Sequence, residues 1–138
     1  MLWILSKRKK KVKKPSKIYL AHKENARTVI AARVNYFAVE HGFSYGRIAI
    51  RDQKRCWGSC STKRNLNFNY KLLFLPFELL DYIVVHELCH LRHFHHRKEF
   101  WLEVEKIIPE YKERVSALRD IERTHGSSAD KLIKLSKE

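Results

Sequence analysis

Residues 76–91, PFELLDYIVVHELCHL, carry the clearest helical pattern in the chain. Pro76 suits the first turn of a helix, where a backbone N–H has no partner within the helix. The apolar side chains that follow recur at the three- and four-residue spacing of an amphipathic helix; they are Phe77, Leu80, Val84, Leu88 and Leu91. We therefore predict a helix that starts at Pro76 and contains the segment HELCH, residues 86–90.

The segment HELCH has the spacing of a zinc site. His86 and His90 are four residues apart, so a helix places both imidazoles on one face. Glu87 lies beside them as a carboxylate base for a water molecule whose pKa zinc lowers to about 7. The competing interpretation is a chance H-E-x-x-H match on a helix with exposed histidines. The apolar helix favours the Zn²⁺ site, because half-buried histidines need a partner.

A catalytic zinc ion usually has three protein ligands. Several residues are candidates for the third ligand. His93 is seven residues from His86, about 10 Å along a helix axis, which is too far for one ion bound through ~2 Å bonds. We favour His96, which requires that the helix end near His93 and that the chain turn back. The competing ligands are downstream carboxylates, namely Glu99, Glu103 and Glu105.

The flanking segments predict an α+β fold. A helical pattern covers about residues 24–41, and alternating patterns at residues 47–51 and 66–70 predict strands. A short third strand has room in the turn-rich segment at residues 56–61. Further helices are expected from about Arg97 to Pro109 and at about residues 110–121. The expected fold is a compact domain with a small antiparallel or mixed sheet of about three strands packed on helices.

Composition and charge suggest one domain with a basic extension. The chain has 138 residues and a formal net charge of +14, and residues 1–17 contain eight Lys or Arg and no acid. Such an arm either binds nucleic acid or is merely solvated. No apolar stretch approaches the ~20 residues that span a bilayer, and three cysteines do not make a disulfide framework. We expect a soluble cytoplasmic protein without a membrane partner.

The chain contains four segments that together are more specific than the H-E-x-x-H spacing alone. In sequence order they are CWGSCS at residues 56–61, NLNFNYKLLFL at 65–75, DYIVVHELCHL at 81–91 and HRKEFW at 96–101. In these segments the chain resembles the YgjP-like metallopeptidase family, which is related to SprT-like and WLM zinc proteases. The resemblance implies a zincin-like domain with zinc ligands at His86, His90 and His96 and with Glu87 as catalytic base.

The chain departs from the pattern of that family in three places. Cys56 stands where an Arg is usual, and His95 stands where an Asn often precedes the third ligand. A short basic arm replaces the β-rich N-terminal portion that members commonly carry. With the resemblance, we predict a flexible basic arm at residues 1–17, a zincin-like metallopeptidase domain at residues 18–125 and a polar tail at residues 126–138.

Three functions compete at this point. The leading hypothesis is a zinc metallopeptidase that hydrolyses peptide bonds in a protein or peptide substrate, with Glu87 as general base. The second is a metal-dependent phosphohydrolase acting on nucleotides, which lacks support from a phosphate-binding glycine loop. The third is a zinc-stabilised nucleic-acid-binding module, for which a base such as Glu87 would be unnecessary.

Other residues are candidates for supporting roles. Glu78 or Asp81 would orient a metal ligand. Asn67 and Asn69 lie on one side of a strand that either binds an extended substrate by backbone pairing or is simply solvated. The candidates for stabilising an oxyanion are Tyr82, Arg97 and Tyr111.

Overall fold

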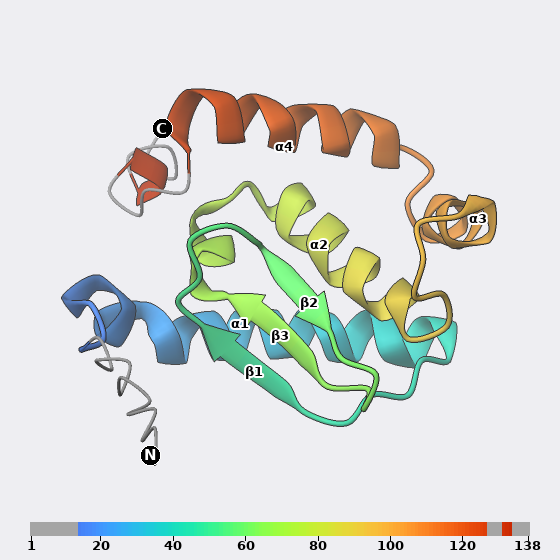
Figure 1. Cartoon of the computed structure of the whole chain (residues 1–138), viewed down its shortest axis with the longest axis horizontal. Helices are drawn as coiled ribbons and strands as arrows, with labels where there is room; N and C mark the ends of the chain where they lie inside the picture. Colours follow the sequence, from blue (N-terminus) through green and yellow to red (C-terminus); the bar gives the residue numbers. More distant parts are fainter. Residues whose placement is uncertain (1–13, 127–130, 134–138) are drawn as a thin grey trace, which may run out of the picture.

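A computed structural model describes residues 14–126 and 131–133 (Figure 1). The order of elements is one helix, three strands, a short 3-10 helix and three further helices. They are α1 (Lys17–His41), β1 (Ile48–Arg51), β2 (Gly58–Cys60), β3 (Leu66–Asn69), η1 (Tyr70–Phe74), α2 (Phe77–His90), α3 (Lys98–Ile107) and α4 (Tyr111–His125). The predicted α+β class is confirmed. Most of the predicted basic arm, residues 1–13, lies outside the described residues.

The three strands form one small mixed sheet in the order β1-β3-β2. β1 pairs in parallel with β3, with Ile48 opposite Leu66. β2 pairs antiparallel with β3, with Gly58 opposite Phe68. This arrangement makes β2 an edge strand, and the contact between Gly58 and Glu87 places that edge beside α2. In Figure 1, α1 crosses behind the sheet, and α4 runs along the far side of α2.

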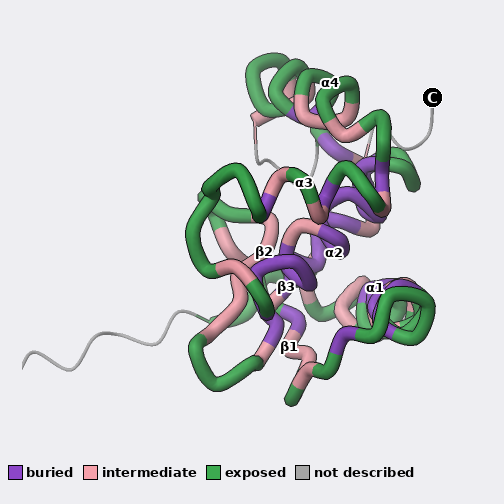
Figure 2. The backbone as a smooth tube through the Cα atoms, turned by 90° about the vertical axis from the view of Figure 1, so that its right-hand side faces the viewer, coloured by how far each residue is buried: buried purple, intermediate pink, exposed green. Residues whose placement is uncertain are grey.

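Helix α2 lies at the centre of the core. Nearly all of its residues are buried, as Figure 2 shows for α2 and β3 in contrast with the exposed outer side of α4. Its apolar side chains pack between the sheet and the flanking helices, because a helix that is apolar on most sides must be covered on most sides. Leu132, which lies in the segment predicted as a polar tail, is also fully buried in this core.

Helix α1 starts at Lys17, about seven residues before the predicted start. The Ser16 side chain caps it by accepting a hydrogen bond from the backbone N–H of Tyr19 at 3.1 Å, which satisfies a donor that has no partner inside the helix. The Tyr19 hydroxyl also donates to the carbonyl of Ile50 at 3.1 Å. The predicted arm therefore overlaps the helix at Lys17.

The 3-10 helix η1 was not predicted, and Asn69 explains its position. The Asn69 side chain accepts from the backbone N–H of Lys71 and donates to the carbonyls of Gln53 and Cys56. Asn69 is 2% exposed. Its side chain therefore stabilises the chain where β3 ends and is not available to substrate.

A part-buried ion pair joins α1 to α2. Arg33 donates two hydrogen bonds to the carboxylate of Asp81, at 2.8 and 2.9 Å. The same guanidinium lies over the rings of Tyr36 and Phe77, and the hydrogen bond to Asp81 raises the pKa of Arg33. Asp81 thus holds two helices together and does not orient a metal ligand.

We expect Asp81→Asn to lower the free energy of unfolding by about 1.5–3 kcal/mol, the usual value of a hydrogen bond to a charged group. Urea denaturation followed by circular dichroism measures the change. Asp120→Asn is the matched control, because the Asp120–Arg123 pair is exposed and such pairs contribute less than about 1 kcal/mol. Equal effects of the two substitutions would contradict the assignment.

None of the helices in the described part of the chain is both long and apolar enough to cross a membrane.

Candidate metal centre

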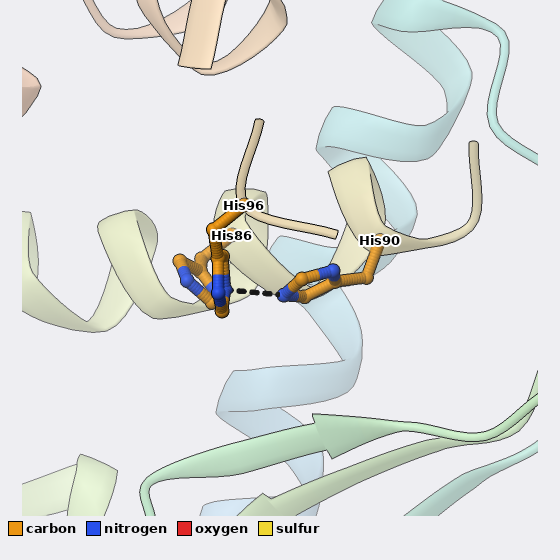
Figure 3. A group of neighbouring side chains, drawn as sticks. All are labelled: His86, His90 and His96. Carbon is orange, nitrogen blue, oxygen red and sulfur yellow. Dashed lines mark hydrogen bonds between the residues drawn. The ribbon is translucent and has the colours of Figure 1, made fainter. Parts of the chain in front are cut away.

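Three histidines converge at the C-terminal end of α2. Their candidate ligand atoms all lie within 4.8 Å of one another, and Nε2 of His90 is 2.9 Å from Nε2 of His96 (Figure 3). His86 and His90 come from α2, whereas His96 comes from the segment between α2 and α3. Within the described residues, this is the one group of three or more potential ligand side chains with metal-binding spacing. The predicted set of ligands is thus brought together.

The chain turns back as His96 requires, but three residues earlier than expected. Helix α2 ends at His90, and Leu91 follows as its C-cap. Arg97 is already extended and precedes α3, with its N–H bonded to the carbonyl of His95 at 2.8 Å. Phe100 of α3 is fully buried and stacks on His90 with 4.5 Å between ring centroids. This contact anchors α3, and with it His96, against α2.

The competing ligands lie elsewhere. His93 points to Glu103, whose Oε2 is 2.7 Å from His93 Nε2, and Glu103 also pairs with Arg92. Glu99 and Glu105 are exposed. Arg92 in turn donates to the carbonyls of His41 and Gly42, each at 2.9 Å. These contacts fasten the turn after α2 to the C-terminus of α1.

That fastened turn also orients His90. The backbone carbonyl of His93 lies 2.9 Å from His90 Nδ1. Since a carbonyl only accepts, His90 carries its proton on Nδ1 and directs the lone pair of Nε2 toward His96. A hydrogen bond to the second ring nitrogen is the usual means of orienting a metal-binding histidine. This role of Glu103 and His93 is not indicated by the sequence, because it depends on contacts across the fold.

The electrostatic surroundings favour the neutral form of two of the candidate ligands, because they lower the pKa of His90 and of His96. Burial lowers the pKa of His90, and the neighbouring histidines lower it further. Burial and His86 likewise lower the pKa of His96. Neutral imidazoles retain the lone pair that a metal requires. Three imidazole nitrogen donors without a carboxylate suit a transition metal such as zinc better than magnesium or calcium, so the residues present fit the metal that the sequence implies.

Glu87 lies between this cluster and the sheet. It is 5% exposed, and its Oε1 is 3.0 Å from Nδ1 of His86. A carboxylate only accepts, so His86 holds its proton on Nδ1 and keeps Nε2 free as a donor atom for a metal. On the other side, a Cβ at Gly58 would lie 3.0 Å from Cγ of Glu87 and 3.1 Å from the carbonyl of Asn67. A side chain at position 58 would therefore be crowded where β2 meets Glu87.

Aromatic residues enclose the site. The Trp101 ring stacks on His96 with 5.9 Å between centroids, and Tyr111 stacks on Trp101 at 5.4 Å. The Tyr82 ring lies 5.9 Å from His86. Burial, together with the charge of Glu87, raises the pKa of Tyr82 to about 12, so its hydroxyl remains a hydrogen-bond donor at neutral pH. Arg97, the other candidate for stabilising an oxyanion, is exposed at the start of α3.

Three features together define the class of metal-dependent hydrolases. They are the buried H-E-x-x-H helix, the histidine cluster and the adjacent carboxylate. Residues 2–121 match the family described as YgjP-like, metallopeptidase domain. The chain belongs to this family, as its sequence segments predicted, and it is a metallopeptidase. Comparison with curated proteins gives no match.

Two solved structures are similar to this chain. The first is the metallopeptidase zymogen abylysin of Pyrococcus abyssi, with 28% identity and a TM-score of 0.59, covering 69% of this chain and 94% of that one. The second is the metallopeptidase zymogen jannalysin of Methanocaldococcus jannaschii, with 26% identity and a TM-score of 0.59, covering 66% of this chain and 94% of that one. Both support the metallopeptidase fold.

We expect His96→Ala to weaken zinc binding by more than about 100-fold, because losing even an outer partner of a ligand costs 10–100-fold. Competition titration against a chromophoric chelator measures the affinity. His95→Ala is the matched control, since His95 is the exposed neighbour of His96 and lies outside the cluster. Wild-type affinity in His96→Ala, or equal loss in His95→Ala, would exclude His96 as the third ligand.

Proposed function

We propose that this metallopeptidase uses zinc bound by His86, His90 and His96, with Glu87 as the general base. The observation that carries the proposal is the buried Glu87 carboxylate next to three imidazoles whose candidate ligand nitrogens lie within 4.8 Å of one another. When bound, zinc supplies a Lewis acid that polarises a carbonyl and lowers the pKa of a water molecule to about 7.

Residues of the protein carry out the proton transfers and stabilise the developing charge. Glu87 accepts a proton from the attacking water and passes it to the nitrogen of the leaving amine. Its position against Gly58 and His86 holds the carboxylate in one place and excludes bulk water from that side. The protonated hydroxyl of Tyr82 is the candidate donor to the carbonyl oxygen, where negative charge develops.

The edge strand β2 suits an extended peptide substrate. The carbonyl of Trp57 accepts from the N–H of Asn69 in β3, and the N–H of Ser61 donates to the carbonyl of Asn65 just before β3. Strand alternation therefore directs the backbone groups of Gly58 and Cys60 away from β3. A peptide can add to such an edge by backbone hydrogen bonds. Because Gly58 lies beside Glu87, a peptide paired here would run past the base. This edge favours peptide bonds over nucleotides as the substrate of the site.

We expect Glu87→Gln to lower the hydrolysis of an unfolded protein such as dye-labelled casein by about 10²–10⁴-fold, the usual contribution of a general base. Zinc stoichiometry should be unchanged, because glutamine can still accept from His86. Plasma emission spectrometry gives the zinc content of the same samples.

Glu99→Gln is the control, since Glu99 is an exposed glutamate outside the cluster. Undiminished casein hydrolysis by Glu87→Gln would eliminate Glu87 as the base. Hydrolysis of nucleotides but not of casein by the wild-type protein would instead favour the phosphohydrolase alternative.

A further inference from the structure

A surface pocket lies beside the histidine cluster. Its volume is about 340 Å³, and it lies along the first half of α4. We call it the α4 pocket; its lining residues are Trp101, Tyr111, Lys112, Val115, Ser116 and Arg119. It has aromatic and aliphatic walls, two cations and no acidic side chain.

Two routes connect the α4 pocket with the candidate metal centre. The first is Trp101, which lines the pocket and whose ring also stacks on His96 and lies 6.1 Å from His86. At the other end, Arg119 is close enough to Tyr82 to act on it electrostatically, and the ring of Tyr82 lies 5.9 Å from His86. The α4 pocket is therefore next to the place where Glu87 would act.

The charges on α4 are separated by face. Lys112 and Arg119 are seven residues apart, so they lie on one side of the helix, two turns from each other. Glu113 and Asp120 line a different pocket, near Arg114, and Glu122 accepts a hydrogen bond from Trp57. Neither Lys112 nor Arg119 forms an ion pair with another described residue. Both cations are exposed and face the α4 pocket.

We propose that the α4 pocket is a substrate-binding subsite that takes a carboxylate of the peptide, supplied by an acidic side chain or by the C-terminus. Arg119 and Lys112 would pair with the carboxylate, and the ring of Trp101 would pack against the aliphatic part of the same residue. Arginine matches a carboxylate through two parallel hydrogen bonds. This assignment rests on the proposed function, because it gives the peptidase a preference for acidic substrates.

The test measures binding, so that it does not depend on turnover. The probes are dansyl-labelled octapeptides of Ala, Leu and Gly with one Glu, Gln or Lys moved through each position. A parallel set without charged side chains has either a free or an amidated C-terminus. Their affinity for zinc-loaded Glu87→Gln is measured by fluorescence anisotropy. At the favoured position, we expect Glu to bind about fivefold more tightly than Gln, as for one good, partly exposed ion pair.

Substitutions test whether the preference for Glu over Gln arises in the α4 pocket. Adding Lys112→Gln and Arg119→Gln together should remove it, and Arg119→Glu should reverse it in favour of Lys. The control is Arg123→Gln, which removes one positive charge from α4 outside the pocket and should leave the preference unchanged. Circular dichroism verifies that each variant is folded. Preference for the free C-terminus over the amide identifies the terminal carboxylate as the source, and a preference confined to internal Glu identifies the side chain.

Equal binding of carboxylate and amide peptides, no binding of any probe, or a preference that survives the double substitution would overturn the proposal. Casein hydrolysis by the wild-type protein is scored separately. A peptidase that shows no carboxylate preference disproves the subsite alone, whereas loss of the proposed function would appear as the absence of casein hydrolysis.

Discussion

The return of the chain after α2, which sets His96 against His90, is the constraint on which the site depends. Two of the three candidate ligands lie on one helix, but the third is separated from it by a turn of irregular backbone. Phe100 holds this turn from the α3 side by stacking on His90. Glu103 holds its other end through Arg92 and His93, and the carbonyl of His93 orients the ring of His90. Ligand geometry and fold stability are therefore built from the same contacts.

Regular local patterns in the sequence made part of the fold and of the candidate site predictable. The apolar spacing of residues 77–91 predicted α2, and the four-residue separation of His86 and His90 predicted that both would share a face. The distance argument against His93 agrees with the structure, in which His93 pairs with Glu103. The early start of α1 was missed because the Ser16 cap has no apolar periodicity, and η1 was missed because Asn69 stabilises it through carbonyls of a separate loop.

Long-range contacts account for the features that no local pattern indicates. Trp57 donates to Glu122, 65 positions away, at 2.8 Å, and so joins the segment before β2 to α4. A side chain at position 58 would be crowded because another element approaches it, and only the folded chain brings Glu87 there. Such contacts set the two sides of the site, the edge of β2 and the face of α4. Substrate selection would depend on both, whereas the ligand set depends mainly on α2 and the turn after it.

The central claim is that His86, His90 and His96 together bind one catalytic metal ion. Zinc-edge anomalous diffraction from crystals of the purified, zinc-loaded protein tests it most directly. The account predicts one zinc peak with three imidazole nitrogens at ~2.0–2.1 Å and one position open to solvent. A zinc ion bound by a carboxylate in place of His96, or one bound by cysteine sulfur, would contradict it.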